Sequence, residues 1–383
     1  MKFRIGIATH YSANNFGAVL QCKALSDAIV ELAPNVECNI LDFEKHNRTI
    51  PPSFSSVFRK KRGAGITGII KGLIHGCLLL YTRIKAKHHT PTQDFINEEM
   101  TLDSRVHINE HGQLAWESEQ IPYNALVCGS DQIWAHWCIS PYFVLETMPH
   151  KAIAKLAYAP SFGDINKLQA DDLRYLETNL KQFSAISCRE QDGAELLNKM
   201  LGKPCPIVPD PTILHTRDYW LKLARKPRNF PHKEKEFVFT YRISFMQHAR
   251  KMASYAAKQL RLPLVTCELV APHSFYSQLG PREFLWCIAN AAHVITPSFH
   301  GTVFSLIMGT PFHSISSSAP QERLKTLLRS VGLLNRLVTE TCQVDTSTPF
   351  PSNNELEHRI EKLRTFGRNW LTSELQKAVT ACN

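Results

Sequence analysis

The sequence lacks the short motifs that identify several common kinds of site. None of its 11 cysteines lies in a CxxC pair, and no His/Cys spacing typical of zinc is present. There is no DxD pair and no Walker phosphate loop, and the turn at residues 15–17 does not match the GxGxxG dinucleotide fingerprint. We therefore expect neither a metal nor a cofactor. An odd number of scattered thiols is typical of a reducing compartment, so we expect a cytoplasmic protein.

A segment that could span a membrane is also missing. The apolar alternation at residues 3–9 is too short for the apolar region of a signal peptide. The apolar run within residues 58–89 is interrupted by Lys71 and His75, so it is too short and too polar to cross a bilayer. Its basic flanks fit an interfacial helix that would make peripheral contact with anionic lipid at the inner face of the membrane. The alternative is a packed helix that covers a sheet.

Acidic residues are the scarcer charge. The 34 Asp and Glu residues stand against 44 Lys and Arg, which gives a formal net charge of +10. Such a surplus favours anionic partners. No Lys/Arg run alternates with aromatic residues and no recognition module is visible, so we expect no nucleic acid. The charge predicts a small anion or an anionic membrane surface as partner.

Buried strands alternate with helices along most of the chain. Short apolar runs at residues 3–9, 36–43, 125–129, 155–158, 185–188 and 237–241 predict strands. A charged stretch with prolines at residues 225–235 is the best candidate linker. We therefore predict an α/β fold of two doubly wound Rossmann-like domains that face a cleft. The predicted domains are residues 1–225 and 226–383, with the last helix, 354–380, packing back on the first domain.

In doubly wound sheets, ligands bind beyond the carboxyl ends of the strands. Polar residues directly follow an apolar strand at four places, which are after Thr9, Gly129, Cys188 and Thr296. We expect side chains from these four places to form the site.

The segment at residues 280–313 carries the most local information. It predicts an amphipathic helix, a buried strand at 293–296, a tight turn at 297–301 and a second helix from Thr302. His300 lies at this turn close to Ser298 and Thr302, where the free N–H groups of a helix N-terminus favour an anion. The alternative is that His300 only caps the helix.

Six segments, spread from the first strand to about residue 338, resemble the polysaccharide pyruvyl transferase family. They are NFGAVLQ at 15–21, CGSDQIW at 128–134, YAPSFG at 158–163, SCRE at 187–190, DPT at 210–212, and a GP pair at 280–281 that leads to SFHGTVFS at 298–305. The resemblance implies a fold like that of GT-B glycosyltransferases, with the active site between the domains. It also implies phosphoenolpyruvate as donor, a cyclic pyruvate ketal on a sugar as product, and a role in exopolysaccharide biosynthesis for the cell envelope.

The resemblance assigns the donor's anionic groups to three residues. Arg189 and His300 match the family's arginine and histidine, and Arg323 matches a third basic residue by spacing. Around His300, further phosphate contacts are expected from Gly301, Thr302 and Ser298. The second domain is accordingly the donor-phosphate side and the first domain the acceptor side.

Ketal formation needs an acid, a reusable base and stabilisation of the leaving phosphate. We assign acid–base work to His300, since an imidazole can serve both roles near pH 7. Asp131 is the second catalytic candidate, as a base or as a group that orients an acceptor hydroxyl. The alternative for Asp131 is a turn aspartate that bonds local N–H groups. Acceptor contacts are expected from Asn14, Asn15, Gly17 and Ser130, with a simple glycine turn as the alternative for the first three.

Two other functions fit parts of the sequence. A GT-B glycosyltransferase that uses a nucleotide sugar is one, but residues 280–313 contain a single acidic residue, Glu283, where carboxylates that hold ribose are expected. A non-catalytic membrane-surface component of a polysaccharide assembly complex is the other. The basic segment at 58–89 would support that role, and it would equally suit a polyprenyl-linked acceptor. Intact Arg189, His300 and Arg323 favour the enzyme.

Overall fold

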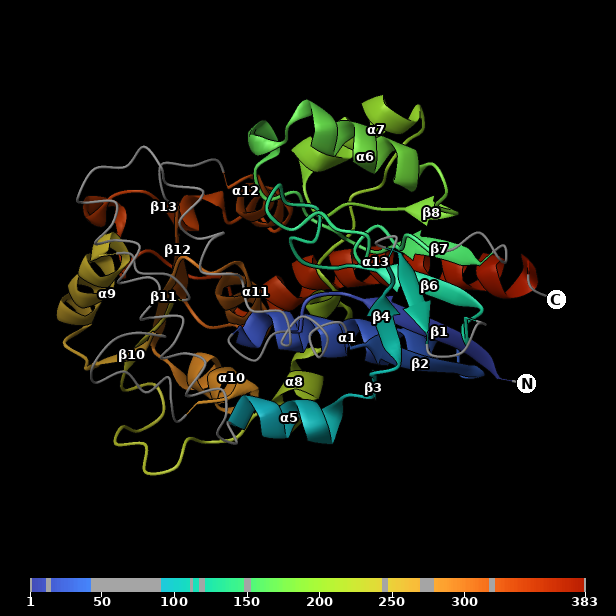
Figure 1. Cartoon of the computed structure of the whole chain (residues 1–383). Coiled ribbons are helices and arrows are strands. Elements are labelled where there is room, and N and C mark those ends of the chain that lie inside the picture. Colours follow the sequence, from blue (N-terminus) through green and yellow to red (C-terminus); the bar gives the residue numbers. More distant parts are fainter. Residues whose placement is uncertain are drawn as a thin grey trace, which may run out of the picture.

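The computed structural model describes residues 2–11, 15–42, 91–110, 113–116, 121–147, 153–242, 247–268, 279–316 and 321–381. Two parallel sheets, each flanked by helices, form the molecule (Figure 1). The α/β fold with two Rossmann-like halves that the sequence predicts is confirmed. Asn14 and the basic segment at 58–89 lie outside the described residues. Within the described ranges, no helix combines the length and apolar character needed to cross a membrane.

The first sheet has six strands in the order β3-β2-β1-β6-β7-β8. Their bounds are β1 Phe3–Ala8, β2 Val36–Leu41, β3 Leu102–Asp103, β6 Ala125–Cys128, β7 Ala154–Ala157 and β8 Ala185–Ile186. All of their pairings are parallel. Counted along the chain this is the 3-2-1-4-5-6 order of a dinucleotide-binding fold, whose order reverses between β1 and β6. The separate pair β4 (Val106–Ile108) and β5 (Leu114–Trp116) is antiparallel.

The second sheet has five parallel strands in the order β10-β9-β11-β12-β13. Their bounds are β9 Val238–Arg242, β10 Leu264–Glu268, β11 His293–Thr296, β12 Phe312–Ile315 and β13 Leu337–Val338. Along the chain this is a 2-1-3-4-5 order, which reverses between β9 and β11. Ligands are expected where the order reverses, so β1 and β6 in one sheet and β9 and β11 in the other mark the two sides of a site.

Helices cover both sheets. They are α1 Phe16–Leu32, α5 Pro91–Glu99, α6 Ala170–Leu180, α7 Gln191–Leu201, α8 Arg217–Leu223, α9 Gln247–Leu260, α10 Pro281–Asn290, α11 Phe299–Met308, α12 Glu322–Ser330 and α13 Asn353–Ala381. The 3₁₀ turns in the described ranges are η1 Ile165–Lys167, η2 Pro211–Leu214, η4 Leu334–Arg336 and η5 Thr341–Gln343. Strands such as β6 and β11 are buried along their whole length because helices shield both of their faces.

The last helix, α13, ties the two halves together. It packs against α1 and η2 of the first half and against α11 of the second, and it ends on the same side of the molecule as β1 (Figure 1). Arg364 donates from Nε to the carbonyl of Ile213 at 3.1 Å, and Arg368 pairs with Glu31 at 3.0 Å. The proposed domain boundary at residue 225 stays a prediction.

One helix start differs from the expectation. Helix α11 begins at Phe299, inside the predicted tight turn, because the Ser298 hydroxyl accepts the N–H of Gly301 and thereby caps the helix at its first turn. His300 is therefore the second residue of a helix and not part of a loop.

Candidate active site

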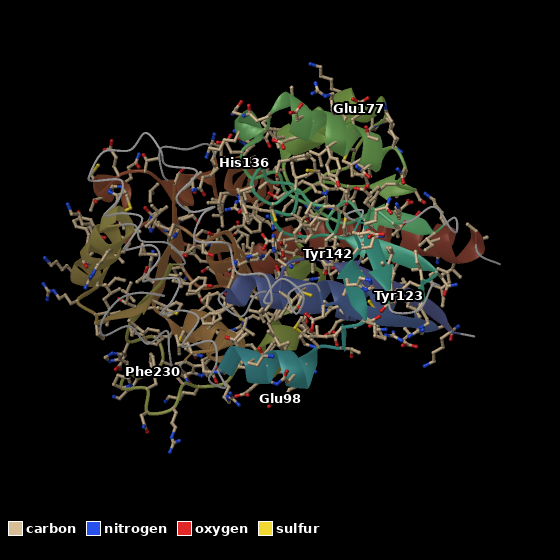
Figure 2. All side chains as sticks on the ribbon, in the orientation of Figure 1. Glu98, Tyr123, His136, Tyr142, Glu177 and Phe230 are labelled. Carbon is tan, nitrogen blue, oxygen red and sulfur yellow. The ribbon has the colours of Figure 1, made fainter. Side chains whose placement is uncertain are left out.

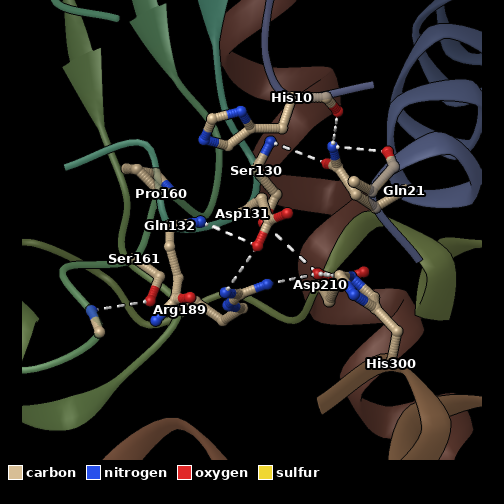
Figure 3. A network of polar contacts seen from close by, with 12 residues as sticks. His10, Gln21, Ser130, Asp131, Gln132, Pro160, Ser161, Arg189, Asp210 and His300 are labelled. Carbon is tan, nitrogen blue, oxygen red and sulfur yellow. Dashed lines mark hydrogen bonds and ion pairs between the residues drawn. The ribbon is translucent and has the colours of Figure 1, made fainter. Parts of the chain in front are cut away.

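Five charged or titratable side chains from both halves meet between the sheets. Asp131 follows β6, Arg189 follows β8, Asp210 caps η2, His300 lies in the first turn of α11, and Arg323 lies in the first turn of α12. We call this set the cleft cluster. Figure 3 shows Asp131, Arg189, Asp210 and His300 converging from separate elements. Three of the four strand ends singled out in the sequence thus supply its members.

Asp210 is the centre of the cleft cluster. Its Oδ2 accepts from Nη1 of Arg189 at 2.8 Å and lies 3.3 Å from Nε2 of His300. Its Oδ1 accepts from the backbone N–H and the hydroxyl of Thr212, at 3.1 and 2.7 Å. Burial alone would raise the pKa of Asp210, but the charges of His300 and Arg189 outweigh it and hold that pKa well below its usual range. Asp210 is therefore a fixed anion that holds both side chains in place.

Asp131 is the second anion of the cluster. It has a left-handed backbone with φ of 70°, and Oδ1 accepts from the N–H of Gln132 at 2.9 Å. The same oxygen lies 3.6 Å from Nη2 of Arg189. Burial would raise the pKa of Asp131, but the charges of His300 and Arg189 lower it below the usual value. Asp131 thus bonds its local backbone, as the alternative interpretation expected, and also faces the cationic groups.

Arg323 stands beside Arg189, and no ion pair involves Arg323 in the described part of the chain. Both guanidinium groups lie over the ring of Phe299, with their carbons 4.3 Å (Arg189) and 5.6 Å (Arg323) from the ring centre. Burial, and then the like charge of Arg189, lower the pKa of Arg323 to about 10. Two neighbouring cations, of which one is unpaired, create a strong preference for an anion.

Several N–H groups of the cluster remain available. Nε and Nη2 of Arg189 and Nε2 of His300 are buried and make no hydrogen bond of good geometry among the described residues, although carboxylate oxygens lie 4.0, 3.6 and 3.3 Å from them. A buried donor left unpaired costs about 1–3 kcal/mol. Such groups are rare in folded proteins unless a ligand satisfies them. These donors point to an anion that binds between Arg189, Arg323 and His300.

The position of His300 depends on a glycine in the other half of the molecule. Gly17, the second residue of α1, lies so close that a Cβ there would overlap the His300 ring. Asn15 caps the same helix, since its Oδ1 accepts from the N–H of Ala18 at 3.3 Å. Asn15 and Gly17 thus bring α1 against α11. Their predicted contact with an acceptor stays a prediction.

The remaining predicted donor contacts already have partners. The N–H of Gly301 donates to Ser298, the N–H of Thr302 donates to the Ser298 carbonyl at 3.0 Å, and the Thr302 hydroxyl bonds Ser314 at 2.6 Å. The N–H groups expected to bind phosphate are therefore engaged within α11. The role of these three residues in donor binding stays a prediction.

Ser130, a predicted acceptor contact, is fully buried. Its hydroxyl donates to the carbonyl of Ala159 at 2.6 Å, and its N–H donates to Oε1 of Gln21 at 3.2 Å. Nε2 of Gln21 in turn donates to the carbonyl of His10 at 2.9 Å. Hydrogen bonds of Ser130 and Gln21 thus connect the turn after β6 to the turn after β1. They fix the position of the neighbouring Asp131. A contact between Ser130 and a sugar stays a prediction.

Sequence reasoning missed the central role of Asp210, which it noted only within a family segment. It also passed over Gln21 and His10. The signal for Asp210 was weak, because an aspartate before proline ordinarily indicates a turn. Glu190, which directly follows Arg189, lies 4.0 Å from Arg189 Nε and accepts from the N–H of Phe162 at 2.7 Å. In the described part of the chain, no group of three or more His, Cys, Asp or Glu side chains could hold a metal ion.

Solved structures with a similar arrangement of elements have low identity to this chain. Medicago truncatula UGT71G1 complexed with UDP-glucose is 10% identical, with a TM-score of 0.45 and coverage of 100% of this chain and 98% of that one. Methanocaldococcus jannaschii UDP-GlcNAc 2-epimerase, in complex with UDP-GlcNAc and UDP, is 15% identical, with a TM-score of 0.41 and coverage of 96% and 100%. The glycosyltransferase SnogD from Streptomyces nogalater is 10% identical, with a TM-score of 0.41 and coverage of 100% of both chains. At these values the likenesses carry no argument about substrate or mechanism.

The sequence itself decides the family. No curated protein is similar enough to match it. The sequence profile of the polysaccharide pyruvyl transferases matches residues 15–319. Because that match begins at the cap of α1, ends just before α12 and so spans most of the chain, this protein belongs to the polysaccharide pyruvyl transferase family.

Proposed function

We propose that this enzyme transfers the pyruvyl group of phosphoenolpyruvate to two hydroxyls of one sugar, forms a cyclic ketal and releases phosphate. The acceptor sugar belongs to a cell-envelope polysaccharide such as an exopolysaccharide, or to its polyprenyl-linked precursor. No cofactor or metal is invoked. The enzyme would work in the cytoplasm, with peripheral contact to the membrane through residues 58–89.

The observation that carries this proposal is the excess of unpaired donors in the cleft cluster. Phosphoenolpyruvate bears a phosphate and a carboxylate on one carbon, so it needs several cationic groups within a small volume. Arg189 has two N–H groups and His300 one that form no well-aligned hydrogen bond with the protein, while Arg323 has no ion pair in the described part of the chain. Guanidinium groups bind carboxylate and phosphate in a bidentate manner, which suits both anionic groups.

The reaction has a simple proton balance. One sugar hydroxyl adds to the central carbon of phosphoenolpyruvate, and the methylene carbon gains a proton and becomes a methyl group. The bond from the central carbon to the phosphate oxygen then breaks, and the second hydroxyl attacks the central carbon and closes the ring. Two hydroxyl protons are released, of which one ends on the methyl carbon and one leaves with phosphate. A single group that accepts and returns a proton is therefore sufficient.

We assign that proton transfer to His300. Asp210, 3.3 Å from Nε2, holds the imidazole in position and remains ionised because its pKa is lowered. Arg189 and Arg323 would stabilise the charge that develops on the leaving phosphate. Asp131, at the edge of the cluster next to Gln132, would orient or deprotonate the attacking hydroxyl.

Ligand-induced thermal stabilisation tests the proposal. We expect phosphoenolpyruvate to raise the melting temperature, because a ligand that binds only the folded state stabilises it. UDP-glucose and inorganic phosphate serve as controls, and phosphate release with glycoside acceptors reports turnover. Stabilisation by UDP-glucose without any effect of phosphoenolpyruvate would overturn the proposal in favour of a nucleotide-sugar enzyme.

A further inference from the structure

A polar pocket of about 160 Å³ opens beside the cleft cluster. Three segments form its wall: the turn after β6, the region of η1, and the start of α12. The residues used below are Gln132, His136, Trp137, Lys167, Gln321 and Arg323. Figure 2 shows His136 at the edge of the molecule, on the side where α6 and α12 lie.

The pocket is continuous with the proposed donor site. Arg323 belongs both to the pocket wall and to the pair of guanidinium groups over Phe299. Gln132, another wall residue, directly follows Asp131. A ligand in the pocket would therefore lie against the phosphoenolpyruvate that the cluster is proposed to hold.

Trp137 is exposed to an unusual degree at this pocket. It is 62% exposed, more than any other large apolar side chain in the described ranges. Its ring is stacked on that of His10, with the centres 6.1 Å apart and an interplanar angle of 20°. His10 is itself fixed between Phe143, 4.7 Å away, and the Cys138 thiol, 3.0 Å from Nε2. An oriented indole left open to solvent beside a concave site is typical of ligand binding.

The polar groups of the wall suit hydroxyl groups. Oε1 of Gln321 is buried and has no hydrogen-bond partner in the described part of the chain. The Gln132 amide lies against Gly163, where φ is +72° and a Cβ would overlap Nε2, so its position is fixed. Lys167 pairs with Asp164 at 3.4 Å. Lys167 is thus paired, and Arg323 is assigned to the donor. The groups that remain for a second ligand include the amides of Gln132 and Gln321, the imidazole of His136 and the indole of Trp137.

We propose that this pocket binds the acceptor as a single neutral hexopyranose unit. The C–H face of the sugar packs on the Trp137 indole, and its hydroxyls bond Gln132 and Gln321. The pocket is small, at about 160 Å³, so we assign it one ring, and the rest of the glycan extends past Trp137 into solvent. This inference rests on the proposed function. It assigns the main acceptor contacts to Trp137 and its neighbours, in place of the turn at residues 14–17 and Ser130.

The test combines kinetics with binding by NMR. Wild type, Trp137→Ala and Trp137→Phe are assayed for phosphate release from phosphoenolpyruvate with p-nitrophenyl galactosides, glucosides, mannosides and N-acetylhexosaminides. Phe366→Ala, which truncates a 50% exposed aromatic on α13 outside the pocket, is the matched control. Saturation-transfer NMR with the same glycosides and phosphoenolpyruvate detects acceptor binding directly.

We expect Trp137→Ala to raise the acceptor KM about tenfold or more with little change in kcat, since the indole contributes binding that substrate and transition state share. Trp137→Phe should recover most of the loss, and Phe366→Ala should behave as wild type. Stabilisation by phosphoenolpyruvate should be the same in all four proteins. An unchanged KM in Trp137→Ala, or no glycoside signal with wild type, would overturn the acceptor pocket. Absence of stabilisation by phosphoenolpyruvate would instead refute the proposed function.

Discussion

Buried histidines occur in two regions of this protein, and their hydrogen-bond partners and neighbouring charges differ. In the cleft cluster, Nε2 of His300 lies 3.3 Å from the carboxylate of Asp210, which also binds Arg189. In the second sheet, His293 and His313 on neighbouring strands bond each other, Nε2 to Nδ1 at 2.9 Å, with rings 5.1 Å apart. Burial, and then the charges of His313 and Arg336, lower the pKa of His293 to about 3, and burial and the charge of Arg336 lower the pKa of His313 to about 4.

The two regions differ in whether the histidine ring nitrogens have hydrogen-bond partners. The strand pair satisfies itself, because one imidazole N–H donates to the other ring, and it remains neutral at pH 7. His300 retains a donor without a hydrogen-bond partner at a place where elements of both sheets meet. Burial of a histidine therefore does not mark a site by itself. A donor without a well-aligned hydrogen bond does mark one when it lies beside an arginine that makes no ion pair in the described ranges.

The largest expected effect comes from removing a side chain of the cleft cluster. His300→Ala and Arg189→Ala should each reduce phosphate release by about 10²–10⁴-fold, because proton transfer or charge stabilisation is lost. His313→Gln should retain turnover near that of wild type, since His313 lies in the sheet and away from the cluster. Circular dichroism controls for folding. If His300→Ala keeps wild-type turnover, or if His313→Gln loses as much, the contrast between the two regions fails.

A smaller effect is expected on stability as the pH falls. A histidine whose folded pKa lies below its unfolded value of about 6.5 takes up a proton on unfolding, so its contribution to stability is complete above about pH 6.5 and is lost as the pH falls toward 4. Each such proton makes the free energy of unfolding fall by up to about 1.4 kcal/mol per pH unit. Burial also lowers the pKa of His10 and His215, which add to the same slope.

Urea denaturation at about pH 7 and about pH 5 measures that slope. We expect His313→Gln to have a shallower slope than wild type, whatever its absolute stability. Asp131 and Asp210 do not interfere, because their pKa values are lowered and their contribution is lost only below about pH 4. Equal slopes in both proteins would mean that the strand pair is not held neutral by burial.

The sequence predicted the second sheet closely near this pair. The strand expected at 293–296 is β11, His293–Thr296, because a short apolar run between turn signals has few other structures open to it. The start of α11 was placed three residues too late, since a serine before an apolar helix can lie either in a turn or at the cap. Elements fixed by local pattern were thus predictable to within a few residues.

Contacts between distant segments were harder to predict. Arg189 and His300 came from family segments and Arg323 from spacing, but Asp210, 21 residues from the arginine it binds, showed no local sign of that pairing. Trp137 gave no sign either, because periodicity cannot tell an exposed tryptophan from a packed one. Such properties arise from contacts between segments that are distant in the sequence, so no short stretch of sequence shows them.

The smallest expected effect, and the sharpest comparison, concerns two arginines. Arg336 is buried and donates from Nη2 to the carbonyls of Thr348 and Pro349, both at 2.8 Å. Arg336→Gln should therefore destabilise the protein, by about 1–3 kcal/mol for the lost bonds. Arg323 has no such partner and stands beside Arg189. Arg323→Gln should leave the ligand-free stability unchanged or raise it by up to about 1 kcal/mol, because it removes a like-charge repulsion.

The same substitution should weaken ligand binding. Stabilisation by phosphoenolpyruvate should largely disappear in Arg323→Gln and partly persist in Arg323→Lys, which keeps the charge but loses the fork geometry. Thermal melts with and without phosphoenolpyruvate give both quantities for the same samples. If Arg323→Gln destabilises the ligand-free protein as Arg336→Gln does, its guanidinium supports the fold, and the placement of Arg323 beside Arg189 would have a structural origin. A gain in stability together with a loss of ligand response would instead show that an anion is what offsets the charge of Arg323.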